Sequence, residues 1–177
     1  FILPLFFVNY AAAAAIRGLW AAPYLEQVFG AEAGTIGRVT LIMGLAMILG
    51  NFLVAPAVRL IGGLRRTVLI FTFATLLVLG FLVLRPEPGL TAATIALALI
   101  GLSGTGYVLL MAHGRSFLPP HLVGRGVTFL NMASIGGAGF MQFSSGAVYR
   151  AASAAYPPPQ AFAMLFLFFL IPLAIGF

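Results

Sequence analysis

The feature that most constrains the fold is a succession of apolar runs, each close to the length of a membrane-spanning helix. A hydrocarbon core of about 30 Å requires roughly 20 residues of helix. Backbone groups cannot remain unpaired in lipid, and none of the runs alternates like a barrel strand, so we expect an all-α membrane protein. The expected transmembrane helices are six, at about residues 1–28, 36–58, 67–84, 91–112, 123–148 and 161–177.

Composition supports a bilayer as the main solvent of the chain. Hydrophobic residues make up 62% of the 177 residues and charged residues only 7%, too few polar groups for the surface of a soluble domain. With no cysteine, two histidines and three acidic residues, we expect no disulfide, metal site or cofactor. The chain begins at Phe1 and stops at Phe177 inside apolar runs, so we expect a segment of a longer protein.

The net charge of +6 indicates topology rather than nucleic-acid binding, because the arginines lie mostly at the ends of apolar runs. The first, third and fifth loops, with their helix ends, contain Arg38, Arg85 and Arg150. The positive-inside rule therefore places the even loops and both ends of this segment in the cytoplasm of a multi-pass inner-membrane protein. The arginines of the second and fourth loops are Arg59, Arg65, Arg66, Arg115 and Arg125.

Polar side chains distinguish the six segments. The third and sixth are almost uniformly apolar and are expected to face lipid, whereas the other four are expected to line a polar cavity. On the fifth, steps of 3, 7, 11 and 18 residues return to one helical face. Such groups bond between helices or line a wet cavity, and five in one line favour the cavity. They are Asn131, Ser134, Gln142, Ser145 and Tyr149.

Arg17 is the most unusual residue of the first segment. It lies about 24 Å of helix rise from Phe1, which places it in the outer third of the membrane. In one interpretation it reaches the outer interface, where Trp20 and Tyr24 form an aromatic belt. In the other it offers a permanently charged fork to a carboxylate or phosphate, on the face that it shares with Tyr10 and Tyr24.

The fourth segment contains Gly101-Leu102-Ser103-Gly104, which is similar to the Gly-x-Ser-Gly of rhomboid intramembrane proteases. A serine nucleophile requires a base within about 3 Å. His113 is ten residues further along the same helix, about 15 Å by rise, and His121 lies in the following loop. We therefore disfavour a protease and expect no enzyme. The glycines of this segment and of residues 136–139 are interpreted as close-packing positions.

The arrangement of the six helices and the basic loop after the second resembles the C-terminal half of a major facilitator superfamily transporter. Residues 58–66, "VRLIGGLRR", resemble the family's Gly-x-x-x-Asp-Arg-x-Gly-Arg-Arg signature, although Val58 stands where the acid would be. Residues 17–25 resemble the outer half of that domain's first helix, and residues 118–131 the cytoplasmic start of its fifth. The resemblance implies two inverted three-helix repeats, an N-terminal six-helix half as partner, and alternating access at mid-membrane.

The functional expectation is a secondary transporter for a small polar or anionic solute. No acidic residue lies at membrane depth, so proton coupling through a carboxylate would require the other half. The alternative, in another class, is a membrane module that scaffolds or senses without transporting. The expected anion contact is Arg17, and the expected hydrogen-bonding residues are Asn9, Tyr10, Asn51, Tyr107, Asn131 and Gln142.

Overall fold

The computed structural model describes residues 3–177, and within that range it contains helices and turns but no strand. Each expected segment contains helix; Phe1 and Ile2, with which the first was expected to begin, lie outside the described residues. The elements are α1 (Leu3–Ala15), a π-helical turn η1 (Ile16–Trp20), α2 (Ala21–Phe29), α3 (Ala33–Ile61), α4 (Leu64–Leu84), α5 (Leu90–Ser103), α6 (Gly106–Arg115), a 3-10 turn η2 (Pro120–Leu122), α7 (Val123–Ala155) and α8 (Pro158–Gly176).

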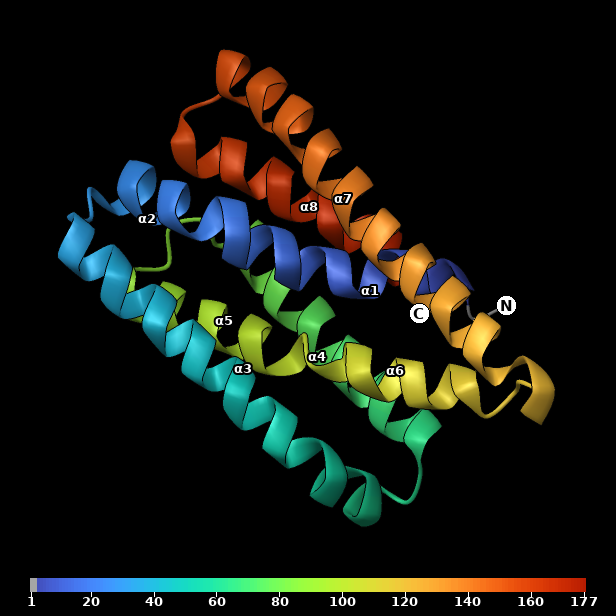
Figure 1. Cartoon of the computed structure of the whole chain (residues 1–177). Coiled ribbons are helices and arrows are strands. Elements are labelled where there is room, and N and C mark those ends of the chain that lie inside the picture. The colour runs from blue at the N-terminus through green and yellow to red at the C-terminus, as the bar shows by residue number, and fades with distance from the viewer. Residues whose placement is uncertain (1–2) are drawn as a thin grey trace.

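Two pairs of these helices form interrupted rods. We call residues 3–29 (α1, η1 and α2) the first rod and residues 90–115 (α5 and α6) the fourth rod. Figure 1 shows both running through the bundle with only local breaks. Both rods, together with α3, α4 and α8, are long and apolar enough to cross a membrane. The described residues are therefore all-helical, and the length and composition of these helices suggest a membrane protein.

The fifth expected segment differs most from its prediction. α7 has 33 residues and continues to Ala155, seven beyond the expected end, because alanine and serine extend the helix until Tyr156 and the prolines. Although it is the longest helix, α7 is not among those apolar enough to be marked as membrane-spanning in the described chain. Its glycine, serine and amide side chains lower its hydropathy.

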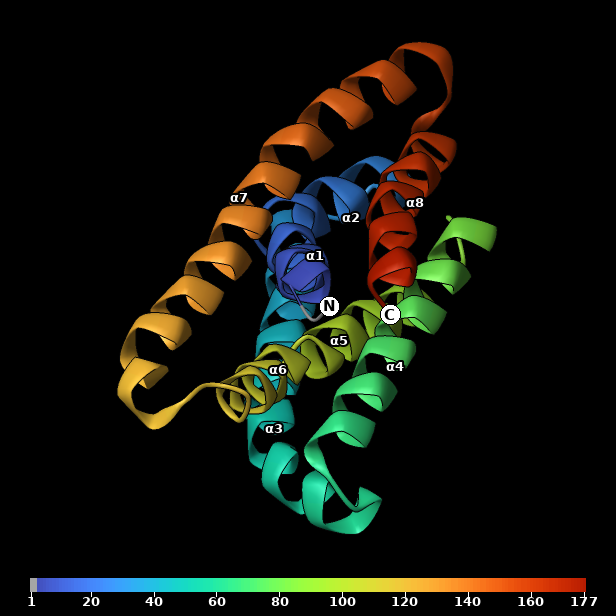
Figure 2. The ribbon, with the colours of Figure 1, turned by 90° about the vertical axis from the view of Figure 1, so that its right-hand side faces the viewer.

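The helices form three layers, which can be followed in Figure 2 around α1, the helix seen end-on there. The first and fourth rods occupy the middle, α4 and α8 one side, and α3 and α7 the other. α1 packs mainly on α7, α3 on α5, and α4 on α8. α4 and α8, the two segments expected to be peripheral, form one outer layer. α3, which was expected to line a cavity, is the least buried helix within residues 3–177, and Phe52 is 74% exposed. Part of its apolar surface is therefore not covered by another helix within residues 3–177.

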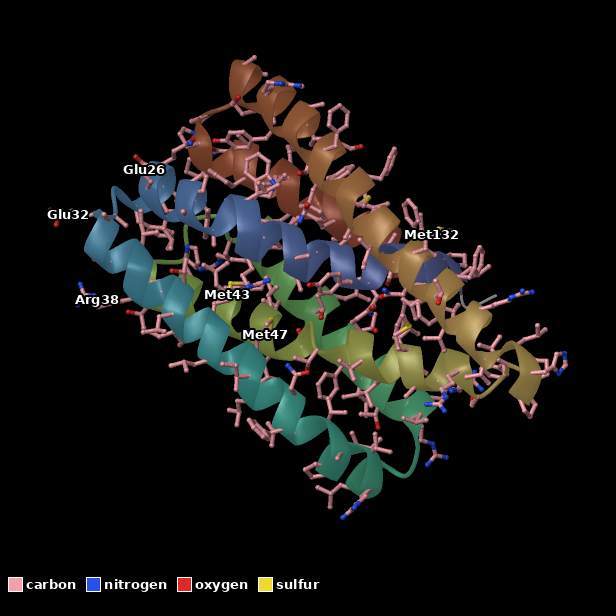
Figure 3. The ribbon with its side chains drawn as sticks, viewed as in Figure 1. Glu26, Glu32, Arg38, Met43, Met47 and Met132 are labelled. Carbon is pink, nitrogen blue, oxygen red and sulfur yellow. The ribbon has the colours of Figure 1, made fainter. Side chains whose placement is uncertain are left out.

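Charge differs between the two ends of the bundle. The end formed by the α3–α4 turn, the α6–α7 loop and both chain ends contains the five arginines expected inside, and we call it the basic end. The opposite, mixed end combines three arginines with all three acids of the sequence, so its formal charge is zero. Figure 3 shows Glu26, Glu32 and Arg38 together there. The bias used to predict orientation is thus a property of the folded bundle.

Proline explains the interruption of the first rod. Pro23 has no N–H to donate to the carbonyl of Leu19, and its ring would collide with that carbonyl in a regular α-helix. The preceding turn widens instead, and the N–H of Ala21 donates to the carbonyl of Ile16, five residues earlier. Gly18 lies in the middle of this π turn.

The fourth rod is interrupted at Gly104 and Thr105, between two further glycines. There the backbone changes to bonds between residues three apart, with the Thr105 N–H to the Leu102 carbonyl at 3.4 Å. The Thr105 hydroxyl also donates to the Leu102 carbonyl, at 2.7 Å. Both central rods therefore depart from α-helix close to their midpoints.

Candidate functional site

A small cavity with several polar side chains in its lining lies where the two interruptions face α3. Its volume is about 120 Å³, and its walls come from the first rod, α3 and the fourth rod. Four of the seven expected site residues line it together, although they are far apart in the sequence. They are Tyr10, Arg17, Asn51 and Tyr107.

Arg17 supplies the only formal charge of this cavity. It is an exposed residue of the π turn, and twelve residues, about 18 Å of helix rise, separate it from the end of the first rod at Phe29. It therefore stands near the middle of the rod rather than in its outer third. A guanidinium at that depth is costly unless it faces other polar groups or water.

The proposed aromatic belt around Arg17 is not present. Trp20 is half-buried and donates its indole N–H to the Ser145 hydroxyl at 2.9 Å, and it packs on Tyr149. Tyr24 is 0% exposed and packs against Phe162. Both rings belong to the protein interior, so they leave Arg17 without the interfacial companions of the first interpretation.

Tyr24 also departs from the face shared by Tyr10 and Arg17. A spacing of seven keeps residues on one face of an α-helix, but the π turn contains fewer degrees per residue and rotates all that follows. The Tyr24 hydroxyl consequently donates to the Pro86 carbonyl in the α4–α5 loop, at 2.8 Å, on the side away from the cavity. The predicted stripe is thus confirmed for Tyr10 and Arg17 and wrong for Tyr24.

Two tyrosines form the aromatic part of the cavity wall. The rings of Tyr10 and Tyr107 lie with their centroids 4.9 Å apart. The Tyr107 hydroxyl donates to the side-chain carbonyl of Asn131 on α7. Asn131 does not line the cavity itself, but it fixes the ring that does. Asn131 is therefore a residue that orients the Tyr107 ring without contacting the cavity.

Asn51 approaches from α3. It is exposed, and its amide nitrogen donates to the Met47 carbonyl one turn earlier at 3.0 Å, which leaves its side-chain oxygen as an acceptor. The preceding residue, Gly50, allows α3 to contact the fourth rod: a Cβ there would lie 2.6 Å from the Leu102 carbonyl and 2.8 Å from the Thr105 hydroxyl. The glycine contact thus sets how closely Asn51 approaches the opposite wall.

The remaining two expected residues lie elsewhere. Asn9 is buried and donates to the Thr72 hydroxyl of α4 at 3.0 Å, which turns it away from the cavity. Gln142 is half-buried on α7 and does not line the cavity; its main-chain carbonyl accepts from the Ser145 hydroxyl at 2.7 Å. Asn9 is an interhelical contact, and the structure does not bring either amide to Arg17.

The polar stripe on α7 is mainly a seam with the first rod. The Ser134 hydroxyl donates to the Phe6 carbonyl at 2.6 Å, and Tyr149 donates to the Gln27 side chain. With the Trp20–Ser145 bond, these contacts extend along most of the shared length. The wet-cavity interpretation of this stripe is therefore wrong, because the side chains of four of its five members, all but Gln142, bond to neighbouring helices.

Sequence reasoning missed the residues that make the cavity possible. The cavity is lined by Gly101, Gly104 and Thr105 beside the polar side chains. A Cβ on Gly101 would lie 2.6 Å from the Met43 carbonyl, so this glycine is a close-packing position, as expected. The available signal was the glycine-rich sequence from 101 to 106, which indicates packing but not a break in the helix.

Ser103, the serine of the protease-like motif, is buried and shares a 2.8 Å hydrogen bond with the Thr75 hydroxyl of α4. His113 lies near the end of α6, at the basic end. Residues 3–177 contain no group of three or more side chains placed to ligate a metal ion. No protein-family model matches the sequence, and no curated protein is significantly similar to it.

Proposed function

We propose that this chain is a six-helix half of a secondary transporter of the major facilitator type, which moves a small polar or anionic solute by alternating access. Arg17 is the anion contact, Tyr10 and Tyr107 form the wall, and Asn51 accepts a hydrogen bond. The observation that carries the proposal is the cavity itself, which joins the chain's one mid-helix charge to two interrupted helices. Binding at discontinuous helices near the midplane is the usual design of such proteins.

The pattern of helix contacts supports an inverted repeat. The chain can be divided into a first set of three segments (the first rod, α3 and α4) and a second set (the fourth rod, α7 and α8). Exchanging the two sets in order converts the α1–α7 contact into the α5–α3 contact and leaves the α4–α8 pair unchanged. In the same exchange the first rod corresponds to the fourth rod, and both are interrupted near their midpoints. An inverted repeat of three helices implies this correspondence. By the positive-inside rule, the arginines of the basic end favour the cytoplasmic side of the inner membrane for that end.

The exposed layer of α3 and α7 fits the second half of such a transporter. Arg17 is exposed in the chain alone, and α3 is the least buried helix. A partner half packed there would cover both and enclose the solute between the halves. Proton coupling through a carboxylate would then reside in the partner, because the acids of this chain lie at the mixed end.

Binding of small anions to the complete purified protein, with both halves present, tests this proposal. Sodium salts of phosphate, sulfate and simple mono- and dicarboxylates are screened for an increase in Tm, and the best is tested for uptake into proteoliposomes. Loss of one charged hydrogen-bonding group should weaken the binding by about 10- to 100-fold in Arg17→Gln, with partial recovery in Arg17→Lys. Arg150→Gln, at the mixed end, removes the same charge away from the cavity and should bind normally.

Unchanged binding and uptake in Arg17→Gln would remove the arginine from the site. If no anion stabilises the protein and no flux appears, the transport proposal fails, and a scaffold or sensor module becomes the better description. If binding persists without flux, a sensor is favoured. These outcomes distinguish the role of Arg17 in anion binding from the transport function of the protein.

A further inference from the structure

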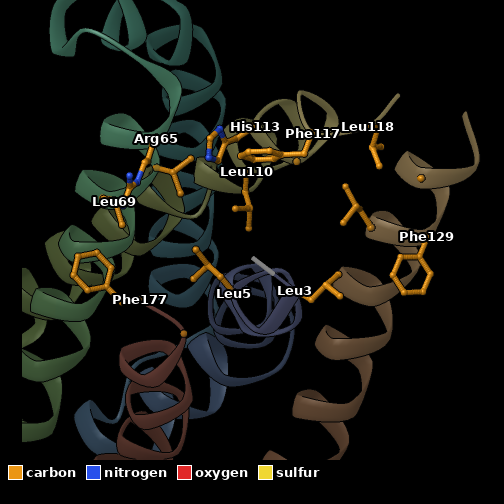
Figure 4. Close-up of a pocket in the computed structure, with 15 residues that line it drawn as sticks. Leu3, Leu5, Arg65, Leu69, Leu110, His113, Phe117, Leu118, Phe129 and Phe177 are labelled. Carbon is orange, nitrogen blue, oxygen red and sulfur yellow. The ribbon is translucent and has the colours of Figure 1, made fainter. Parts of the chain in front are cut away.

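A second and larger cavity lies at the basic end and takes no part in the proposed transport site. Its volume is about 680 Å³, and its walls come from α1, α4, α6, α7 and α8, as Figure 4 shows. The two cationic or titratable side chains of the lining are Arg65 of α4 and His113 of α6. The rest of the wall is mainly leucine, phenylalanine and glycine.

The polarity of this cavity changes with depth. Arg65 is the second residue of α4, and His113 lies two residues before the end of α6. Both therefore stand where their helices reach the basic end. Leu69 and Leu110 lie about one turn deeper on the same two helices. The cavity is therefore cationic at its mouth and apolar beyond it.

The surroundings favour an anion at the mouth. The basic end contains five arginines, and the three carboxylates of the sequence all belong to the mixed end. An anionic group at Arg65 would thus meet attraction without a nearby competing acid. A small water-soluble anion would satisfy the mouth but would leave the leucine and phenylalanine walls without an apolar partner.

We propose that this cavity binds an anionic phospholipid, with its phosphate at Arg65 and His113 and an acyl chain along Leu69 and Leu110. Basic pockets between transmembrane helices on the cytoplasmic side recognise anionic headgroups in this way. A zwitterionic lipid offers the same chain without the net charge, and free phosphate offers the charge without the chain. The inference is independent of transport and requires only that the protein resides in a membrane.

Three probes distinguish the possible sources of this chemistry. Dioctanoyl phosphatidylglycerol, dioctanoyl phosphatidylcholine and inorganic phosphate are titrated into the purified protein in a nonionic detergent, and apparent affinities are taken from the increase in Tm. We expect the phosphatidylglycerol to bind more tightly than the phosphatidylcholine, and inorganic phosphate to give no comparable shift. Equal effects of the two lipids, or a full effect of phosphate alone, would overturn the proposal.

Matched variants locate the site. Arg65→Gln should weaken phosphatidylglycerol binding by about fivefold, the effect of one basic residue near a membrane surface. Arg66→Gln removes the same charge from the neighbouring residue, which does not line the cavity, and should retain the affinity. Equal affinities in Arg65→Gln and Arg66→Gln would show general surface attraction and refute the site. Arg65→Lys keeps the charge and should retain the preference for phosphatidylglycerol if Arg65→Gln is unstable.

The apolar chamber has its own pair of variants. Leu69→Trp fills the cavity and should weaken both lipids, whereas Ile70→Trp enlarges a neighbouring side chain that is 49% exposed and does not line the cavity. Unchanged lipid binding in Leu69→Trp would mean that no acyl chain enters the chamber.

Discussion

The seam between α1 and α7 gives the sharpest prediction, because two adjacent glycines differ completely in their surroundings. A Cβ on Gly137 would overlap the main-chain carbonyl of Phe7, which cannot rotate away. A Cβ on Gly136 would meet no atom within 4 Å. Gly137→Ala and Gly136→Ala therefore add the same methyl group to the same helix, once against backbone and once into open space.

The difference in stability between the two variants measures the cost of the steric overlap alone. Alanine is better than glycine in a helix by up to about 1 kcal/mol, and this gain is common to both positions. Overpacking costs about 1–3 kcal/mol, so Gly137→Ala should be less stable than Gly136→Ala by that amount. Separation of the helices would also stretch the buried bond from Ser134 to the Phe6 carbonyl, now 2.6 Å. We expect the upper half of the range for that reason.

Denaturation by a titration of SDS in mixed micelles measures this difference directly. Trp20, the single tryptophan of the sequence, bonds to Ser145 across the same two helices, so its emission reports the seam locally. A lower midpoint for Gly137→Ala, with Gly136→Ala at or above the wild type, is the expected result. Equal midpoints for the two variants would show that α1 and α7 are not in backbone contact.

Two further predictions concern hydrogen bonds between segments that are distant in the sequence. Thr75→Val and Ser103→Ala should be non-additive, with a coupling energy of about 0.6–1.7 kcal/mol in a double-mutant cycle of unfolding, because each removes one side of the same buried bond; additive losses would contradict it. Tyr24→Phe should lower stability by about 1 kcal/mol and accelerate amide hydrogen exchange in residues 85–89, because it removes the bond that ties this loop to α2; exchange at the wild-type rate would refute that role.

The lengths of the apolar runs and the glycine and proline residues between them were sufficient to predict where the helices lie. The turn between α3 and α4 is an example: Gly62 and Gly63 have φ angles of +84° and +140°, which only glycine adopts readily, so the chain ends its helix where the sequence indicated. Charge also separated the loops into two groups, because the arginines of the second and fourth loops lie at one end of the bundle and those of the other loops at the opposite end. These are local properties, and a sequence carries them directly.

Partners of polar side chains could not be predicted in the same way. The sequence placed Asn9 beside Arg17 but contained no information that Thr72, 63 residues away, would accept its bond. The stripe on α7 was correctly recognised as one face, yet a single face does not reveal whether water or another helix covers it. Here the covering helix is α1, and the choice depends on packing between distant segments.

The π turn explains how one helix serves two different surroundings. An unbroken α-helix would put Arg17 and Tyr24 within about 20° of one face, since seven residues make nearly two turns. Five residues of π geometry lose roughly 90° relative to α geometry, because the repeat grows from about 3.6 to about 4.4 residues per turn. Arg17 can therefore face the cavity while Tyr24 packs on α8 at 0% exposure. Pro23 disrupts the α-helical hydrogen bonding through its missing N–H, so a residue that does not line the cavity helps to turn the Tyr24 ring away from the face that Arg17 shares with Tyr10.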